Sequence, residues 1–196
     1  MTIDEFIEKV ASEKSRTYKR QVARMSPALE RKLKEGGHLM VSELESDPER
    51  TLEWRIFREA HVIGPGLSLA QIRAWQAKWP NHPLPGDLVE LLQQINGIHL
   101  WADMPEGRSY EGIAPLEEWG LARNAMYGSD ADPDLLEERY LALSYHSDSA
   151  VYIVLNVECG KYFWMDSCGP DEGSLIGASV GELLDWVWEH RIPSEE

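Results

Sequence analysis

The sequence predicts an α+β fold: a twisted antiparallel sheet of about six strands, with helices packed mainly on one face, plus an N-terminal helical extension. Strand-like segments follow one another through short turns between residues 140 and 176, as in an antiparallel meander. Helical segments lie on both sides of that run along the chain, which favours separate helical and strand regions. Hydrophobic residues make up 43% of the 196 residues, enough for a packed core.

The extension is predicted to begin with a helix. Thr2 and Glu5 have the spacing of a capping box, in which the two residues satisfy each other's backbone N–H groups. An apolar stripe starts at Ile3, and the helix is expected to continue to Met25 with a basic outer face. Ser26-Pro27 is expected to begin a second helix.

The boundary of the extension is expected near residue 65. Residues 42–60 are expected to form a further helical region. The tripeptide Gly64-Pro65-Gly66 follows, and it is the clearest linker signal in the chain because glycine and proline interrupt regular structure. We therefore predict an N-terminal helical extension over residues 1–65 and an α+β domain over residues 66–196.

The domain is predicted to open with two helices and a strand. Ser68 and Gln71 form a capping box for the first helix. The second helix carries an apolar stripe at i, i+3, i+4 and i+7: Leu88, Leu91, Leu92 and Ile95. Gly97 is expected to end that helix in the left-handed conformation. Residues 98–101 then have the apolar character of a short strand.

The middle of the domain is predicted to contain a strand, a helix and an acidic loop. The strand is expected at residues 110–114, and Pro115 is expected to open a helix that reaches Met126. Residues 128–134, with the sequence GSDADPD, are expected to be an exposed loop because turn-forming residues dominate them.

The last part of the domain is predicted to be a meander and a helix. Four strands are expected: residues 140–145, 150–157, 161–165 and 175–176. The second of these is apolar on both faces and is expected in the centre of the sheet, whereas the fourth is expected at an edge. Ser179 and Glu182 are expected to cap the final helix.

Two motifs in this domain carry a family resemblance. Leu84-Pro85, an amphipathic helix and Asn96-Gly97 give the pattern LPxDLxELLxxxNG, and residues 112–119 read GIAPLEEW. Followed by two apolar strands and an amphipathic helix, these motifs resemble the SUKH superfamily over residues 68–190. The residues that match them are Leu84, Pro85, Asn96, Gly97, Pro115, Leu116 and Trp119.

The resemblance implies the same α+β architecture and a function in binding proteins. The group includes yeast Smi/Knr-type regulators of cell-wall synthesis and many bacterial immunity proteins that neutralise toxins. It therefore implies a non-catalytic bacterial immunity protein that binds a toxin. The alternative is a regulatory scaffold that binds endogenous proteins, and a third interpretation, a hydrolase, requires a pocket with converging polar groups.

The charge of the chain favours a basic protein as that partner. The net charge is −15, and its sign changes along the chain. Residues 1–35 hold nine Lys/Arg and six Asp/Glu, a net of +3, whereas residues 36–196 carry −18. Such an anionic body disfavours nucleic acid and anionic membranes as partners and attracts a basic protein. The basic residues of the extension are expected to form a solvated helix face.

Acidic residues in the expected loops are the candidate binding surface. A basic toxin, such as a nuclease with a phosphate-binding cleft, would be attracted to them. The alternative is that they are ordinary solvated charges. The candidates are Asp103, Glu106, Glu111, Asp130, Asp132, Asp134, Asp171 and Glu172.

No motif in the sequence indicates catalysis, a cofactor or a metal site. Residues 144–149, SYHSDS, hold serine, histidine and acid together, but a turn is expected there because a catalytic triad needs a spatial arrangement. His146, Cys159 and Cys168 match no zinc-binding spacing. We therefore expect no enzyme activity, no catalytic residue and no cofactor.

A cytoplasmic protein, either a monomer or a homodimer, is the expectation for this chain. Its first ten residues include three acids, unlike a signal peptide. The longest apolar run, residues 150–155, is too short to cross a membrane. The two cysteines are expected to be free thiols.

Overall fold

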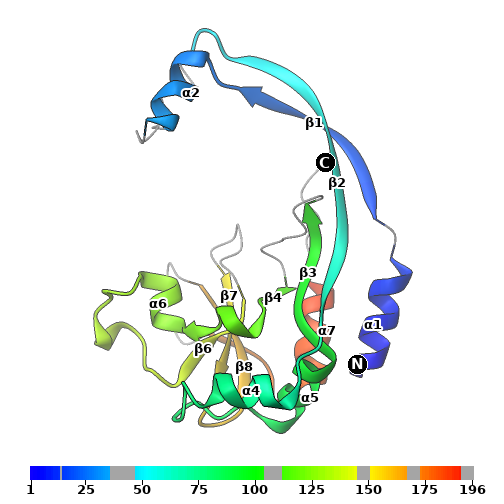
Figure 1. Ribbon diagram of the computed structural model, residues 1–196, viewed down its shortest axis with the longest axis vertical. Coiled ribbons are helices and arrows are strands. Elements are labelled where there is room, and N and C mark those ends of the chain that lie inside the picture. The colour runs from blue at the N-terminus through cyan, green and yellow to red at the C-terminus, as the bar shows by residue number, and fades with distance from the viewer. Residues whose placement is uncertain (14, 36–46, 104–111, 145–150, 167–172, 191–196) are drawn as a thin grey trace. The chain divides into compact units, whose positions relative to one another are not determined.

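The computed structural model describes residues 1–13, 15–35, 47–103, 112–144, 151–166 and 173–190 (Figure 1). The chain divides into two compact units. One contains Met1–Ser15 and Glu59–Glu195, and we call it the main unit. The other contains Arg16–Arg58, and we call it the ribbon unit.

The α+β class is confirmed. The described residues form six α-helices and two antiparallel sheets, with strand orders β1-β2-β3-β4 and β5-β6-β7-β8-β9. The expected single sheet of about six strands is therefore two sheets with nine strands among the described residues. The elements are α1 (Ile3–Ser12), β1 (Arg16–Arg24), α2 (Pro27–Lys34), β2 (Thr51–Pro65), α4 (Leu69–Gln76), α5 (Gly86–Gln94), β3 (Ile95–Asp103), β4 (Gly112–Ile113), η1 (Leu116–Glu118), β5 (Gly120–Leu121), α6 (Ala122–Tyr127), η2 (Pro133–Leu135), β6 (Tyr140–Ala142), β7 (Val151–Asn156), β8 (Lys161–Asp166), β9 (Ser174–Gly177) and α7 (Val180–Glu189).

The meander predicted near the end of the chain is confirmed. Strand β7 lies in the centre of the five-stranded sheet, and its residues from Tyr152 to Asn156 are all buried. It pairs along its whole length with β8, from Val151 opposite Asp166 to Asn156 opposite Lys161. Strand β9 lies at the edge, as expected. The apolar character of β7 agrees with burial of both its faces, because Ile153 and Leu155 belong to one hydrophobic cluster and Tyr152 and Val154 to another.

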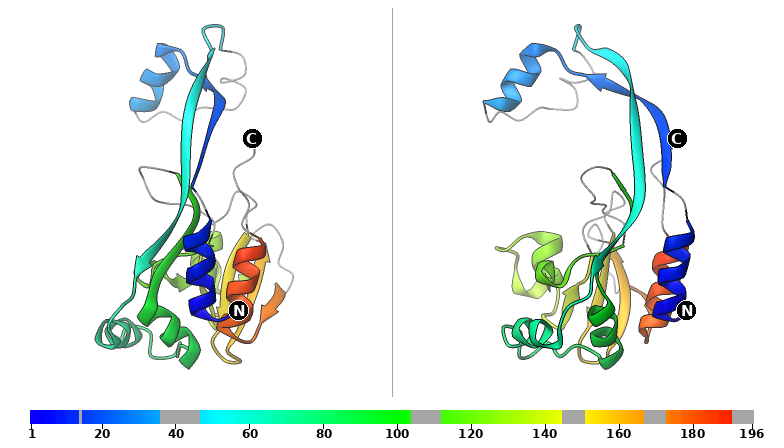
Figure 2. Two further views of the ribbon diagram at one scale, coloured as in Figure 1. Left: turned by 90° about the vertical axis from the view of Figure 1, so that its right-hand side faces the viewer. Right: turned by 45° about the vertical axis from the view of Figure 1, so that its right-hand side comes forward.

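Helices α1 and α7 lie side by side in the main unit, although they are far apart in sequence (Figure 2). Phe6, which is fully buried, meets Trp188 edge-to-face with ring centroids 6.0 Å apart. The N-terminal ammonium group lies 2.6 Å from the Asp185 carboxylate. Asp87 of α5 accepts a hydrogen bond of 2.8 Å from the N–H of Val180, so α5 satisfies a donor at the start of α7.

Most buried side chains of the main unit form one hydrophobic core. It joins α1, α4, α5 and α7 to both sheets through aliphatic and aromatic residues. The largest fully buried members are Phe6, Leu88, Leu92, Ile95, Ile98, Leu100, Leu116, Leu141, Leu143, Leu155, Tyr162 and Leu183. At about 1.5–3 kcal/mol for each large apolar side chain removed from water, this cluster is the main source of stability.

The helix expected to run from the N-terminus to Met25 is wrong beyond Ser12. Residues Arg16–Arg24 form strand β1 and pair with β2. Tyr18 in β1 stacks on Phe57 in β2, with ring centroids 5.5 Å apart. Aromatic and β-branched residues favour such cross-strand packing, and this pairing overrides the helical spacing of the apolar residues. The helix after Ser26-Pro27 is confirmed as α2.

The helical region expected over residues 42–60 is also wrong where the structure describes it. Residues Thr51–Pro65 form strand β2, which pairs antiparallel with β3. Gly64 and Pro65 of the expected linker are the last two residues of this strand. A Cβ atom on Gly64 would lie 1.9 Å from the carbonyl oxygen of Asn96, so this glycine permits close approach of two backbones.

Two expected helix boundaries inside the domain differ from the structure. Helix α5 ends at Gln94, and Gly97 lies inside β3 with a φ of +94°. The helix expected from Pro115 to Met126 is divided into η1, β5 and α6. The cause is Trp119, which adopts extended backbone angles and turns its ring into the core, where Nε1 donates 2.7 Å to the carbonyl of Ala114.

Candidate functional site

Three of the eight acidic residues predicted to bind a partner have described side chains. Asp130, Asp132 and Asp134 are exposed and lie between α6 and β6. Asp103 ends strand β3, but its side chain lies outside the described part of the chain. The other four also lie outside it: Glu106, Glu111, Asp171 and Glu172. The clustering of all eight at one rim therefore stays a prediction.

The segment from Gly128 to Glu138, which we call the acidic segment, is anchored by hydrogen bonds at several points. Asp132 caps η2 by accepting 3.0 Å from the N–H of Asp134. The guanidinium group of Arg123 in α6 donates 3.3 Å to the carbonyl of Pro133. The carbonyl of Glu138 lies 2.6 Å from Nε2 of the buried His82, and this nitrogen must carry the proton because a carbonyl only accepts.

Exposed carboxylates lie on both sides of an exposed leucine along the acidic segment. Leu135 is 50% exposed, and Glu137 and Glu138 follow it. Glu137 is paired with Arg139 at 2.9 Å, and Glu138 lies 3.6 Å from Arg123. Among the described residues, no Lys or Arg lies within ion-pair distance of the carboxylates of Asp130, Asp132 or Asp134. These three carboxylates are therefore available to a basic partner.

Leu135, Glu137 and Glu138 were not among the residues predicted from sequence. The signal for them was present in residues 130–138, DADPDLLEE, where an apolar pair interrupts an acidic run. The prediction stopped at the turn-forming residues, so it missed the apolar centre of the segment.

Helix α6, which precedes the acidic segment, is hydrogen-bonded to the five-stranded sheet. The hydroxyl of Tyr152 in β7 donates 2.8 Å to the carbonyl of Ala125 in α6, and burial raises the pKa of this hydroxyl. It therefore stays a donor across the physiological range. The hydrogen bond that Arg139 donates to the carboxylate of Glu158 raises the pKa of Arg139. That guanidinium thus remains charged beside the segment.

The two motifs that carried the family resemblance meet in space. Asn96 accepts 2.8 Å from the N–H of Leu116 and donates 3.2 Å to the carboxylate of Glu117. A Cβ atom on Gly97 would lie 3.1 Å from the ring of Pro115. Leu116 and Trp119 are buried. These residues join β3 to η1, so they support the fold.

A buried histidine–carboxylate pair lies elsewhere in the main unit. Nε2 of His61 lies 2.5 Å from the carboxylate of Glu13, and the His61 side chain is 2% exposed. Its Nδ1 accepts 3.1 Å from the backbone N–H of Trp101, so the proton of the neutral ring lies on Nε2. Trp101 has a φ of +52°, an unusual backbone conformation for a bulky residue.

This pair is not arranged for catalysis. A general base needs a free nitrogen within reach of a substrate. Both nitrogens of His61 are engaged inside the protein, and its ring packs against Trp101 with centroids 4.4 Å apart. The pair therefore holds α1 and β2 to β3.

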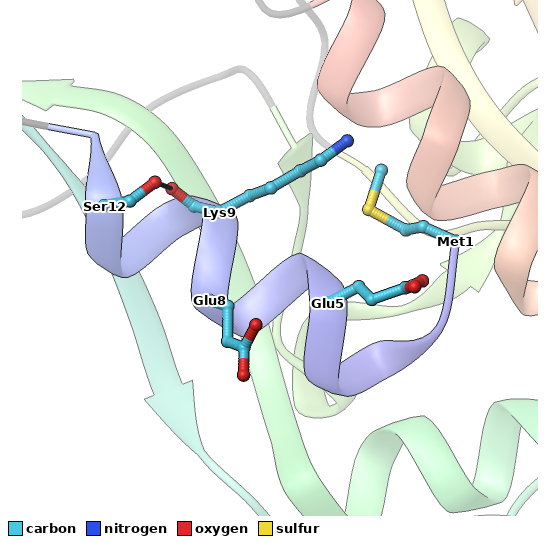
Figure 3. Close-up of a pocket in the computed structure, with 5 residues that line it drawn as sticks. All are labelled: Met1, Glu5, Glu8, Lys9 and Ser12. Atoms are coloured by element: carbon cyan, nitrogen blue, oxygen red, sulfur yellow. Dashed lines mark hydrogen bonds between the residues drawn. The ribbon is translucent and has the colours of Figure 1, made fainter.

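A shallow, open depression beside α1 is lined by Met1, Glu5, Glu8, Lys9 and Ser12. Figure 3 shows Lys9 and Glu8 pointing to different sides of the helix. The ammonium group of Lys9 lies 5.8 Å from the centre of the Trp188 ring, and Glu5 accepts from the N–H of Thr2 in the capping box. Because its lining comes from a single helix and from Met1, which precedes that helix, this depression does not enclose a small molecule.

Two kinds of site are not found within the described residues. No three His, Cys, Asp or Glu side chains in that part of the chain lie close enough together to hold a metal ion. Its helices are all too short or too polar to cross a membrane. In the predicted turn after β6, Ser144 accepts 2.8 Å from the N–H of Ile153, and residues 145–149 lie outside the description.

Comparison with known protein families matches residues 66–186 to the SMI1 / KNR4 family (SUKH-1). The chain belongs to this family. The match covers more than half of the sequence and contains both motifs that join at Asn96 and Leu116. A search among curated proteins gave no match. In this SMI1 / KNR4 family member, the acidic segment lies inside the matched range, whereas the ribbon unit lies before it.

Proposed function

We propose that this protein is a non-catalytic protein-binding module that neutralises a toxin by direct binding, as an immunity protein. The observation that carries the proposal is the acidic segment, in which exposed carboxylates precede and follow the half-exposed Leu135 along the chain. An apolar centre with a charged rim is the usual composition of a protein interface. Membership of the SUKH-1 family supports a protein as the ligand.

The charge of the chain indicates which protein surface would fit. Residues 1–15 and 59–196 together hold nine Lys/Arg and 27 Asp/Glu, a net of −18. A field of this sign accelerates association with a basic surface and disfavours acidic ones. A nuclease toxin presents such a surface, because its cleft binds phosphates. Carboxylates at Asp130, Asp132 and Asp134 would occupy the places of those phosphates.

Co-expression with the products of the genes that flank this one, screened first for toxicity to the host, tests the proposal. We expect the wild-type chain to restore growth and to bind the purified toxin. Changing Asp130, Asp132 and Asp134 together to asparagine should weaken binding at least tenfold. Raising the salt concentration should also weaken binding of the toxin by the wild-type chain.

A matched variant distinguishes an effect of the acidic segment on binding from an effect of the net charge of the chain. Glu8, Glu90 and Glu189 are exposed helix residues, and their change to glutamine removes the same three charges. This variant should bind the toxin within about twofold of wild type. Equal losses in both triple variants would show that only total charge matters, and no binding by the wild-type chain would refute the immunity function.

A regulatory scaffold is the second candidate, since the yeast Smi/Knr-type proteins of this group are regulators of cell-wall synthesis. The same acidic segment would then bind endogenous proteins. Binding to several endogenous proteins that the triple asparagine variant loses, without protection from a toxin, would favour this candidate.

A further inference from the structure

The ribbon unit has no core of its own among its described residues. Within residues 16–58, Ser26 is the only described side chain that is buried. Helix α2 buries no residue and leaves Leu33 45% exposed. Two paired strands and an eight-residue helix are marginally stable in water without an apolar surface to pack against. A partner surface that covers these exposed apolar side chains would therefore stabilise the unit.

One face of the paired strands β1 and β2, which we call the ribbon, carries a row of exposed apolar side chains, which we call the stripe. Leu52, Trp54 and Ile56 alternate along β2 and are 60%, 66% and 62% exposed. Alternate residues of a strand point to the same face, so the three side chains form one row. Phe57 points to the other face, where it stacks on Tyr18 with an interplanar angle of 18°.

The cations of strand β1 are concentrated on the face opposite the stripe. Strand β1 contains four Lys/Arg and no acid. Because Tyr18 shares a face with Phe57, alternation places Arg16, Arg20 and Arg24 on that same face. The guanidinium group of Arg16 lies 5.0 Å from the centre of the Tyr18 ring, which agrees with this placement. On the stripe side, alternation places Lys19 of β1 and Arg58 of β2.

We infer that the stripe face of the ribbon binds the same face of a second copy of this chain. Two ribbons packed face to face would bury both rows of Leu52, Trp54 and Ile56 and leave Arg16, Arg20 and Arg24 in solvent. Such a contact is self-complementary under a twofold axis, which closes the assembly as a dimer. Two packed antiparallel layers are also the standard way for strand pairs to cover an apolar face.

The area of the stripe is suited to this role. Its three side chains expose on the order of 400 Å², comparable with the largest apolar patch of an ordinary monomer and often functional. Each partner of a standard interface contributes about 800 Å², so the stripe supplies roughly half and flanking residues the rest. Trp54 lies in the middle of the row, where a tryptophan contributes most to binding.

An acidic protein or a nucleic acid fits the stripe less well. Either would be recognised by cations, and in β1 these are mainly on the other face. Salt would weaken the binding of an acidic protein or a nucleic acid by cations, whereas dimerisation through the stripe should respond in the opposite way. Because both copies carry a net charge of −15, salt should strengthen their association.

Sedimentation equilibrium of the full chain over a range of concentrations tests the inference. We expect a monomer–dimer equilibrium whose dissociation constant rises at least about thirtyfold in Trp54→Ser. Leu52→Ser should also raise the dissociation constant of the dimer. Leu175→Ser is the matched control, because Leu175 is 57% exposed and belongs to β9 of the main unit. It should leave the dissociation constant within about twofold of wild type.

Cross-linking identifies the face that is used. In a chain with both native cysteines changed to serine, Ile56→Cys should be joined between copies by a short bismaleimide. Arg55→Cys, one residue away on the opposite face, should not. A wild-type chain that stays monomeric, or a dimer unaffected by Trp54→Ser, would overturn the inference. So would stripe-dependent binding of an acidic protein or a single-stranded oligonucleotide by the monomer.

Discussion

Asn96 accepts a hydrogen bond of 2.8 Å from the backbone N–H of Leu116, twenty residues further along the chain. The amide of the same side chain donates 3.2 Å to the carboxylate of Glu117. One side chain thus fixes the start of β3 against η1. This contact explains why the two sequence motifs occur together: each is half of one junction.

Replacing Asn96 should therefore destabilise the protein without removing a surface. Asn96→Ala leaves the N–H of Leu116, which is part-buried, without its acceptor, and we expect a loss of about 1–3 kcal/mol in the free energy of unfolding. Asn96→Asp keeps the acceptor but places a second carboxylate beside Glu117, so its loss should be smaller. Urea denaturation measures both. Asn81→Ala, at an exposed position, is the control and should change stability by less than about 0.5 kcal/mol.

Gly97→Ala should be costly for two independent reasons. The residue has a φ of +94°, and an added Cβ would lie 3.1 Å from the Pro115 ring. We expect a loss of about 1–3 kcal/mol in the free energy of unfolding, measured by denaturant titration. Gly86→Ala is the comparison, because α5 contains Gly86 and an added Cβ meets nothing within 4 Å. It should stabilise the helix, and equal losses in both variants would contradict the explanation from φ.

The sequence was most informative where local and tertiary preferences agree. Helix α4 begins at the capping box of Ser68 and Gln71, and β7 is central because both of its faces are apolar. It misled where they conflict. Residues 16–24 have apolar spacing compatible with a helix, but cross-strand packing of Tyr18 on Phe57 decides for a strand. No local pattern contains that information.

The candidate site was predicted in part for a similar reason. The acidic loop at Asp130, Asp132 and Asp134 followed from turn chemistry, which is local. The pairing of Glu138 with Arg123 and the contact of His82 with the same segment depend on which elements pack together. The pairing of His61 with Glu13 likewise joins residues 48 positions apart and was not predicted.

His61→Ala should destabilise the main unit strongly. The substitution removes a buried ring, its bond to Glu13 and the acceptor that it provides for Trp101. We expect a loss of about 2–4 kcal/mol in the free energy of unfolding, together with a change in tryptophan fluorescence. Glu13→Gln keeps an acceptor for Nε2 and should cost less. If the two variants lose the same amount, the packing of the ring against Trp101 contributes little.

Stability should fall in acid partly through Glu182. This carboxylate accepts 2.8 Å from the N–H of Ala178 and 3.0 Å from the hydroxyl of Ser179, and the backbone bond is the main cause that lowers its pKa from the ordinary value of 4.5. A folded-state pKa below the unfolded one stabilises the protein above the unfolded pKa, and this contribution is lost as the pH falls through the folded pKa. Thermal unfolding between pH 7 and pH 3 measures the effect.

Glu182→Gln should lower the melting temperature at pH 7 and reduce its further decline between pH 5 and pH 3, because glutamine cannot be protonated in that range. Glu189→Gln is the control at the other end of α7, where the carboxylate is exposed. It should leave the slope of the melting temperature against pH close to that of wild type. A Glu182→Gln protein whose melting temperature declines as steeply as wild type would show that this cap does not contribute to acid sensitivity.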